Sequence, residues 1–249
     1  MNPWLMVGVS ALAAGAAGLA AFSPMRPGSQ LVGSSTWHTG NARKLALTFD
    51  DGPNPAITPR LLSLLEKYHA KASFFLVGKY VRESPGLVKE LAAQGHVIGN
   101  HTETHPNLLF CSARETTEEL LRCTEAIQNV TWTQPRWFRP PFGFRNPWLT
   151  EIVHRQGMRT AMWTLIPGDW RVKPSAWLIE KMKPVADAAT ENIPKLGQGI
   201  KARPGDIICL HDGDYARPNA DRNHTVSALE YWLPRWRDLG LQFVTMDEI

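Results

Sequence analysis

Residues 44–53 read KLALTFDDGP, an apolar run that ends in two adjacent carboxylates and a Gly-Pro turn. The run from Lys44 to Phe49 predicts a buried strand. Neighbouring strand residues point to opposite faces, but a bend at the strand end would let Asp50 and Asp51 face one site. Two carboxylates that lie close together repel each other, so a cation between them is expected. A capped turn on the surface is the alternative interpretation.

Short apolar runs alternate with helical patterns along the rest of the chain. Further strands are predicted at residues 72–77, 97–99, 136–138, 160–163, 207–210 and 242–244. Helices are predicted at residues 59–65, 85–94, 113–128, 147–156, 175–182 and 226–239. Such alternation implies a parallel sheet with helices outside it. Seven or so units favour a closed or nearly closed barrel, and an open doubly wound sheet is the alternative.

Local signals mark several helix ends. Thr58 followed by Pro59 predicts an N-cap and the first helical residue. Ser112 and Glu115 have the spacing of a capping box, and Gly95 predicts a helix stop. With these boundaries, the segments that contain the candidate polar residues lie on the connections that follow the predicted strands.

Residues 5–22 carry no charge and are rich in Ala and Gly. Their length suits a long signal-sequence core or a weak membrane anchor, and an apolar helix lying on the domain is the alternative. No basic residue precedes them and the nearest cation is Arg26, so the positive-inside rule taken literally would put the domain in the cytoplasm. We expect residues 5–22 to associate with the membrane, with their orientation left open. We expect the protein to lie at the cell envelope, either anchored or exported. Residues 1–28 thus form an N-terminal segment with its linker, and residues 29–249 form one domain.

The composition of the 249-residue chain excludes several classes of protein. Its net charge of +4 comes from scattered Lys and Arg residues, so no nucleic-acid partner is expected. Its three cysteines include no C-x-x-C pair, which argues against a thiolate zinc site. Cys209 lies in an apolar run and is expected in the core. Cys111 and Cys123 could pair in an exported domain or stay unpaired.

Residues 101–106 read HTETHP and place two histidines four positions apart. His101 and His105 converge if the segment is helical, and they also converge in a tight turn. Imidazole nitrogen and carboxylate oxygen are ordinary zinc ligands, and three protein ligands with an open position are typical of a catalytic site. Glu103 lies two positions after His101, so the H-E-x-x-H pattern of zincins is absent.

Three further segments place polar residues after predicted strands. His211 follows the apolar run 207–210, where a lone histidine is more often a satisfied core residue. Arg139 precedes a rigid Pro-Pro turn and could hold a carboxylate bidentately, or lie on the surface. Asp169 precedes Trp170. Asp169 is either a carboxylate of the site or a loop residue, with the ring of Trp170 in the core. Barrels and open sheets gather their sites at the carboxyl ends of strands, so these residues are expected to meet.

With these five segments in this order, the chain resembles the NodB-homology polysaccharide deacetylases, the family-four carbohydrate esterases. The motifs that carry the resemblance are TFDDGP at 48–53, HTxxHP at 101–106, RPPFG at 139–143, Asp169-Trp170 and Leu210-His211. They span about residues 45–212, and the likeness continues more weakly to the C-terminus. The resemblance implies that residues 29–249 are a catalytic domain with an α/β fold, a distorted (β/α) barrel of about seven strands.

The resemblance also implies a role for each motif residue. One divalent metal ion, usually Zn²⁺, would be bound by Asp51, His101 and His105. Asp50 would be the catalytic base and His211 the catalytic acid. Arg139 would orient Asp50, and Asp169 would tune His211. The backbone N–H of Phe142 would complete an oxyanion site. Trp170 and Leu210 would wall the pocket for the acetyl methyl group.

The chemistry of amide hydrolysis requires this set of groups. Water must be activated, the oxyanion stabilised and the leaving nitrogen protonated, which a metal ion, a base and an acid achieve together. Two positions depart from the family pattern. Ile166 stands where an acidic or amide residue is frequent, and Phe142 stands where tyrosine is frequent. Neither change removes an implied ligand, base or acid.

We therefore expect a hydrolase that removes the N-acetyl group from an N-acetylated sugar in a polysaccharide such as peptidoglycan or chitin. The first alternative is the same chemistry on a lipid-linked sugar, an O-acetyl ester or another amide. The alternative of another class is a carbohydrate-binding protein without catalysis, against which the retained Asp50 and His211 argue.

Aromatic rings are expected to stack on the flat faces of the sugar. Trp148, Trp163 and Trp170 are the candidates, whereas most of the ten tryptophans are expected in the core. The loop at residues 213–224 follows His211 and is expected to shape one rim of the site.

Overall fold

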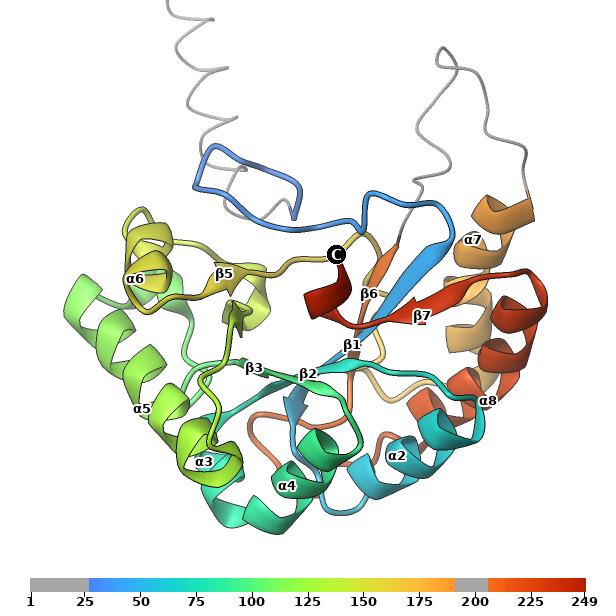
Figure 1. The fold of residues 1–249 in the computed structure, drawn as a ribbon, viewed down its shortest axis with the longest axis horizontal. Coiled ribbons are helices and arrows are strands. Elements are labelled where there is room, and N and C mark those ends of the chain that lie inside the picture. The colour runs from blue at the N-terminus through green and yellow to red at the C-terminus, as the bar shows by residue number, and fades with distance from the viewer. Residues whose placement is uncertain (1–26, 191–205) are drawn as a thin grey trace, which may run out of the picture.

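The computed structural model describes residues 27–190 and 206–249 (Figure 1). Seven strands form one sheet in this part of the chain. They are β1 (Lys44–Gly52), β2 (Ser73–Leu76), β3 (Val97–Asn100), β4 (Trp137–Phe138), β5 (Arg159–Thr160), β6 (Ile207–His211) and β7 (Gln242–Val244). Their order is β5-β4-β3-β2-β1-β6, β7 pairs with β1, and these pairs are parallel. The parallel sheet expected from the strand-helix alternation is confirmed.

The sheet curls around β1. Lys44–Ala46 pair with β7 and Thr48–Gly52 pair with β2, whereas Ala46–Asp50 pair with β6. Beyond β5, Leu165 forms an isolated bridge with Ile208 of β6, so the segment after β5 reaches the other end of the sheet. The expected distorted (β/α) barrel of about seven strands is therefore confirmed as a curled sheet, and the open doubly wound alternative is wrong.

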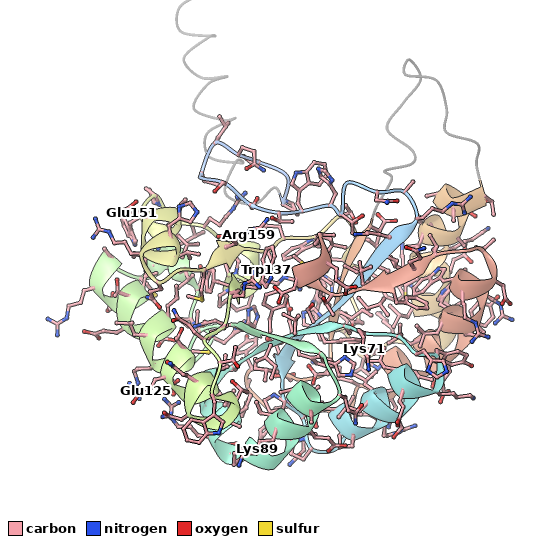
Figure 2. The ribbon with its side chains drawn as sticks, in the orientation of Figure 1. Lys71, Lys89, Glu125, Trp137, Glu151 and Arg159 are labelled. Atoms are coloured by element: carbon pink, nitrogen blue, oxygen red, sulfur yellow. The ribbon has the colours of Figure 1, made fainter. Side chains whose placement is uncertain are left out.

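Helices form the outer layer around this sheet (Figure 1). They are α2 (Thr58–Lys67), α3 (Gly78–Glu83), α4 (Pro85–Ala93), α5 (Ala113–Thr131), α6 (Leu149–Arg155), α7 (Ser175–Thr190) and α8 (Asn223–Asp238). Within the described residues, short 3-10 helices lie in two connections, η2 (Leu108–Phe110) and η3 (Pro141–Gly143), and a further one, η4 (Met246–Glu248), lies at the C-terminal end. Figure 2 shows Lys89, Glu125 and Glu151 on the outer side of the helices, with Trp137 toward the middle of the molecule.

Alternate residues of β1 point into different parts of the core. Leu47 and Phe49 are buried in the large cluster that joins the sheet to α2 and α8. Ala46 belongs to a second cluster, together with buried residues of β2, β4, β6 and β7 inside the curl of the sheet. Asp50 lies on the Ala46 side because strand side chains alternate with a period of two. The strand therefore delivers a carboxylate to the inside of the barrel.

Several predicted boundaries differ from the structure. Thr58 is the first residue of α2 and not its N-cap, because its hydroxyl donates to the carboxylate of Asp212. α3 follows β2 after a single residue and was not predicted. The strand expected at residues 160–163 ends at Thr160. Beyond it, Thr36, which lies in the segment before β1, accepts a hydrogen bond from the Met162 N–H at 2.7 Å.

Other helix ends follow tertiary packing. α7 continues past the predicted end at residue 182 to Thr190, although Pro184 lacks the N–H of a helical hydrogen bond. Met182 and Val185, on either side of Pro184, are buried and hold the helix against the core. α5 likewise runs past residue 128 to Thr131.

The structure confirms two predicted helix-end signals and shows the state of the cysteines. The capping box of Ser112 and Glu115 is present, and Gly95 ends α4 with a left-handed φ of 78°. The three cysteines are all free, so the pairing considered for Cys111 and Cys123 is not formed.

The segment expected to associate with the membrane, residues 5–22, lies outside the described residues. Across residues 27–190 and 206–249, no helix combines the length and the apolar character that crossing a membrane requires. The lead-in before β1 packs on the barrel, where Thr36 bridges Ala161 and Arg145 donates to the Ser29 carbonyl at 2.9 Å. The lead-in therefore lies against the sheet and not away from it.

Candidate active site

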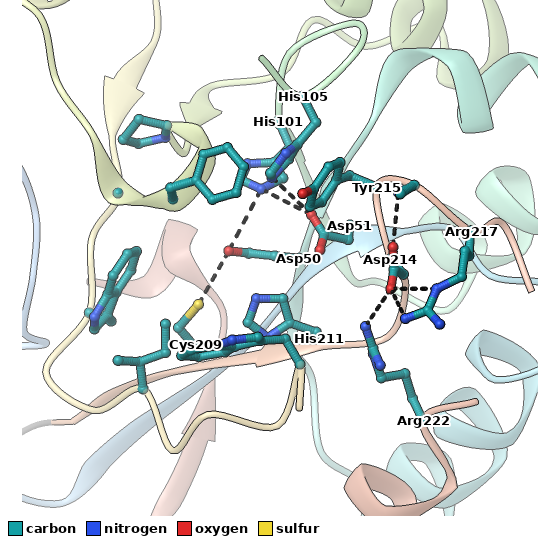
Figure 3. Close-up of a pocket in the computed structure, with 17 residues that line it drawn as sticks. Asp50, Asp51, His101, His105, Cys209, His211, Asp214, Tyr215, Arg217 and Arg222 are labelled. Carbon is teal, nitrogen blue, oxygen red and sulfur yellow. Dashed lines mark hydrogen bonds and ion pairs between the residues drawn. The ribbon is translucent and has the colours of Figure 1, made fainter. Parts of the chain in front are cut away.

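A pocket of about 620 Å³ opens at the carboxyl ends of β1, β3 and β6 (Figure 3). Its polar lining includes Asp50, Asp51, His101, His105 and His211. Its apolar lining includes Phe142, Trp163, Ile166, Trp170 and Tyr215. A concave site with an apolar wall and a few convergent polar groups is the usual form of a small-molecule site.

A bulge in β1 brings two adjacent carboxylates to this pocket. The pairing with β2 shifts register between Asp50 and Gly52, and Asp51 adopts a left-handed φ of 70°. The side chains of Asp50 and Asp51 therefore face one site, as the expected bend required. Close packing behind the bulge requires glycine, because a Cβ on Gly213 would lie 2.1 Å from the Asp51 carbonyl oxygen.

Two histidines after β3 converge on Asp51 through a tight turn and not through a helix. His105 adopts a φ of 62° within this turn. Asp51 Oδ1 lies 3.1 Å from His105 Nε2 and 3.5 Å from His101 Nε2 (Figure 3). Glu103 does not join them, because its carboxylate pairs with Arg82 at 2.6 Å.

The donor set of Asp51, His101 and His105 fits a divalent cation. Its three ligand atoms lie within 4.8 Å of one another. Asp51 Oδ1 is buried and accepts no hydrogen bond from the residues that the structure describes, and a buried acceptor of this kind calls for an ion or water. His101 Nδ1 donates to the Arg139 carbonyl at 2.7 Å, which leaves Nε2 free as a ligand. Burial raises the pKa of Asp51, but the two histidines hold that pKa well below its usual range.

Arg139 is fully buried and holds Asp50. Its Nη1 donates to Asp50 Oδ1 at 2.8 Å and to Thr48 Oγ1 at 2.7 Å. The contact with Asp50 is single and not bidentate as expected, because Thr48 shares Nη1 and the Met162 carbonyl takes Nη2 at 3.1 Å. Cys209 Sγ donates to the other oxygen, Asp50 Oδ2, at 3.2 Å. Both oxygens of this carboxylate are therefore fixed.

His211 is paired with Asp169 at the end of β6. Its Nδ1 donates to Asp169 Oδ1 at 2.8 Å, and its backbone N–H donates to Oδ2 at 2.7 Å. Thr225 and His224 of α8 hold Asp169 from behind, through Oδ2 and the backbone carbonyl. Burial lowers the pKa of His211, but the carboxylates of Asp169, Asp51 and Asp50 together more than offset this and raise the pKa to about 9.

Aromatic side chains form much of the rim. The Trp170 ring meets His211 edge-on, with centroids 5.4 Å apart. The Tyr215 ring stacks on His105 at 4.3 Å with an interplanar angle of 12°, and Phe142 meets the same imidazole edge-on at 4.7 Å. The loop after β6 thus contributes to the rim, as its position in the sequence suggested.

Three residues differ from their expected places. Leu210 is buried on the helix side of β6 and is not among the residues that line the pocket. Cys209, expected only as a core residue, lines the pocket and contacts Asp50. The alternation of strand side chains could have shown this, because Cys209 lies two positions before His211 on one face. Trp148 lines a separate hollow between α5 and α6, whereas Trp163 and Trp170 line the pocket.

The chain matches known proteins over most of its length. Residues 38–161 match the family model described as polysaccharide deacetylase. A peptidoglycan-N-acetylglucosamine deacetylase of Bacillus cereus is 34% identical over 220 residues, which cover 88% of this chain and 93% of that protein. The chain belongs to the polysaccharide deacetylase family. A second relative, a chitooligosaccharide deacetylase of Sinorhizobium fredii, is 33% identical over 205 residues, 80% of this chain and 88% of that protein.

Solved structures of polysaccharide deacetylases have the same fold. The Bc1960 peptidoglycan N-acetylglucosamine deacetylase aligns with a TM-score of 0.72 and 28% identity, over 85% of this chain and 90% of that one. Wild-type BA3943, a CE4 family pseudoenzyme from Bacillus anthracis, aligns with a TM-score of 0.72 and 25% identity, over 86% and 68%. Similarity of fold therefore does not show whether a member of this family is catalytically active. That question depends on the residues in the pocket.

We expect Asp169→Asn to lower the pKa of His211 in the metal-free protein, because a neutral amide no longer stabilises the imidazolium charge. An NMR titration of the His211 ring should show a fall from about 9 toward the ordinary value of 6.5. Asp214→Asn is the control, since Asp214 pairs with Arg217 and Arg222. An unchanged pKa in Asp169→Asn would show that this carboxylate does not set the charge of His211.

Proposed function

We propose that this chain hydrolyses the N-acetyl amide of N-acetylglucosamine units in a glycan such as peptidoglycan or chitin, with one Zn²⁺ as its cofactor. The observation that carries the proposal is the donor set of Asp51, His101 and His105, which shares one pocket with Asp50 and His211. The two relatives named above are called peptidoglycan-N-acetylglucosamine and chitooligosaccharide deacetylases, and both substrates contain this amide.

Asp51 Oδ1, His101 Nε2 and His105 Nε2 would bind the metal ion. One carboxylate and two imidazoles are ligands that Zn²⁺ accepts, and three protein ligands leave room for water and substrate. A metal ion bound there supplies Lewis acidity, which lowers the pKa of water and polarises the amide carbonyl. The Arg139 carbonyl fixes the tautomer and the orientation of His101.

Asp50 is the general base of the proposed reaction. Its carboxylate would take the proton of the attacking water. The buried guanidinium of Arg139 stabilises the negative charge of Asp50, and Cys209 fixes the second oxygen. Arg139 therefore acts as a positioning residue, held in turn by the carbonyls of Ala161 and Met162.

His211 is the proposed general acid. An amine leaves an amide poorly unless its nitrogen is protonated, so a proton donor is required. Asp169 occupies Nδ1 of His211 and leaves Nε2 to give the proton. Because its pKa is raised to about 9, His211 carries the required proton at neutral pH.

The pocket wall supplies the remaining contacts. Phe142 adopts an uncommon φ of 58° in the RPPFG turn, and we assign its backbone N–H to the oxyanion. Only the backbone is used, so phenylalanine in place of tyrosine leaves this contact intact. Trp163, Ile166 and Trp170 offer apolar surface for the acetyl methyl group and the sugar ring, a role that Leu210 does not share because it lies outside the pocket.

His105 is oriented by packing instead of by a hydrogen bond. Its Nδ1 is buried and has no hydrogen-bond partner within the described parts of the chain. The Tyr215 ring covers the imidazole face, and the Tyr215 carbonyl accepts hydrogen bonds from Lys79 Nζ at 2.6 Å and from the Tyr80 hydroxyl at 2.9 Å. Tyr215 is therefore a positioning residue for this metal ligand.

The enzyme would act at the cell envelope. Peptidoglycan-like substrates lie outside the cytoplasmic membrane, and the uncharged residues 5–22 would export or anchor the catalytic domain formed by residues 29–249.

The purified chain should release acetate from N-acetylglucosamine oligomers and from peptidoglycan, as measured by an enzyme-coupled acetate assay. A chelator should abolish the release and Zn²⁺ should restore it. Asp50→Asn keeps the size of the side chain but removes the base, so kcat should fall by about 10²- to 10⁴-fold. Asp238→Asn, an exposed change on α8, is the matched control and should keep full activity.

No acetate from either substrate, with one Zn²⁺ bound, would overturn the N-acetylglucosamine proposal. Full activity of the Asp50→Asn variant would instead overturn the role of Asp50 alone.

Tyr215→Ala should weaken Zn²⁺ binding by about 10- to 100-fold, the range found when groups behind metal ligands are removed. Tyr215→Phe keeps the stacked ring and should bind Zn²⁺ as tightly as the unaltered protein, and Tyr231→Ala removes an exposed ring remote from the pocket as a control. Competition with a chelating dye measures the affinity without any need for turnover. Equal affinities of the Ala and Phe variants would contradict the positioning role.

A further inference from the structure

We propose that the pocket contains a second metal site, made by Asp50, Cys209 and His211, which binds a thiophilic divalent cation such as Cd²⁺ or surplus Zn²⁺ and thereby inhibits the enzyme. The binding follows from the geometry of these three residues. The inhibition, but not the binding, rests on the proposed function.

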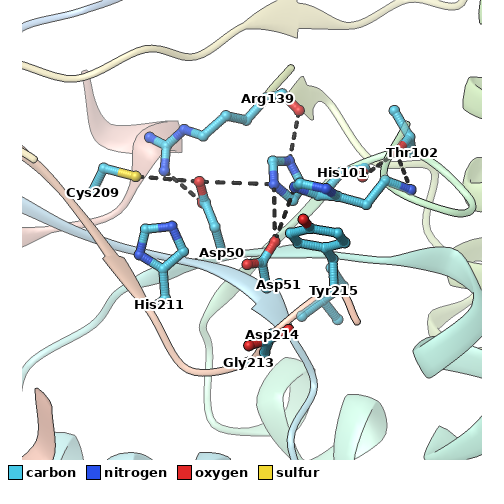
Figure 4. Close-up of polar contacts among 12 residues, drawn as sticks. Asp50, Asp51, His101, Thr102, Arg139, Cys209, His211, Gly213, Asp214 and Tyr215 are labelled. Atoms are coloured by element: carbon cyan, nitrogen blue, oxygen red, sulfur yellow. Dashed lines mark hydrogen bonds and ion pairs between the residues drawn. The ribbon is translucent and has the colours of Figure 1, made fainter. Parts of the chain in front are cut away.

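Three different ligand types meet at this place. One ligand atom from each of Asp50, Cys209 and His211 lies within 4.8 Å of the others. Cys209 Sγ already lies 3.2 Å from Asp50 Oδ2. The three residues come from neighbouring strands in register, since Asp50 of β1 pairs with His211 of β6, and Cys209 precedes His211 by two residues on the same face. Figure 4 shows these side chains around Asp50, on the other side of that carboxylate from His101.

The surroundings favour a bound cation. Asp169 holds His211 through Nδ1, which leaves Nε2 as the ligand atom, and a carboxylate behind a histidine is a common support in metal sites. Cys209 is 1% exposed, yet it lines the pocket, so a cation can enter from the solvent side. Three protein ligands leave a coordination position open toward the pocket.

The chemistry selects a soft cation. On binding, the Cys209 thiol and the Nε2–H of the His211 imidazolium each lose a proton to solvent, and the sulfur and Nε2 form bonds to the cation, while Asp50 binds as the carboxylate. The thiolate and the carboxylate together balance the charge of a divalent ion. Thiolate ligands favour Zn²⁺ and Cd²⁺ over hard ions such as Mg²⁺, whereas the neighbouring set of Asp51, His101 and His105 contains no sulfur. A thiolate signal therefore distinguishes the two sites.

The other cysteines do not offer such a site. Cys123 Sγ is buried and donates to the Leu76 carbonyl at 3.4 Å. Cys111 is partly exposed at the start of α5. Neither belongs to a group of metal-binding side chains in the described ranges, so each can serve as a control.

Occupancy of this site would stop catalysis. The cation would take the Asp50 carboxylate and the His211 nitrogen, the groups assigned as base and acid. The polysaccharide deacetylase would then be active with one equivalent of Zn²⁺ and inhibited by a second equivalent of a thiophilic ion.

The test is a Cd²⁺ titration of the full chain loaded with one equivalent of Zn²⁺. We expect a thiolate-to-cadmium absorption band in the near ultraviolet that saturates at one further equivalent, while acetate release falls along the same curve. In Cys209→Ser the band should be absent, and Cd²⁺ should inhibit only at concentrations at least tenfold higher, relative to the activity of that variant alone. Cys111→Ser should behave as the unaltered chain. Cys209→Ala provides a second variant, and thermal unfolding checks that each one folds.

A band that persists in both Cys209 variants would overturn the proposal. Binding of Cd²⁺ only with release of an equal amount of Zn²⁺ would also overturn it, because Cd²⁺ would then occupy the first site and no second one. A band that depends on Cys209 in a chain that releases no acetate would keep the metal site and overturn the proposed function instead. Inhibition that is equal with and without the Cys209 sulfur would show that Cd²⁺ acts elsewhere.

Discussion

The direction in which the side chains of β1 point controls the geometry of the pocket. A regular strand would send Asp50 into the barrel and Asp51 toward the helix-side core beside Phe49, where a buried unpaired carboxylate is very unfavourable. The bulge after Asp50 turns Asp51 into the barrel instead. Gly52 and Gly213 make this possible, because a Cβ at either would collide with the Asp212 carboxylate or with the Asp51 backbone.

The buried charges around the bulge are arranged in pairs. Arg139 faces Asp50 at 2.8 Å and Asp169 faces His211 at 2.8 Å. The pocket thus places the candidate base beside a buried guanidinium and the candidate acid beside a buried carboxylate, next to the candidate metal ligands. The carboxylates around His211 raise its pKa to about 9, which suits a proton donor. The same proximity explains why Cys209, which touches Asp50, can bring a further ligand to the pocket.

Much of this arrangement is predictable from sequence, and the exceptions have physical causes. The apolar run at residues 44–49 and the strand-helix alternation predict the parallel barrel, because burial and period are local properties. Membership of a motif does not show which way a side chain points: Leu210 belongs to a motif but points to the helix side, whereas Cys209 shares the face of His211 and points into the pocket, as strand alternation indicates. The segment after Thr160 leaves its ladder because Thr36, far away in the sequence, pairs there. The single contact of Arg139 with Asp50 likewise depends on Thr48, which sequence alone does not place.

The proposed reaction depends on one catalytic metal ion held by Asp51, His101 and His105. The most direct measurement is a crystal structure of the Zn²⁺-loaded chain with anomalous diffraction recorded above and below the zinc absorption edge. We predict one anomalous peak at one equivalent of Zn²⁺, within about 2.0–2.2 Å of Asp51 Oδ1, His101 Nε2 and His105 Nε2. A peak elsewhere, or no peak in a protein that is active without metal, would contradict the account.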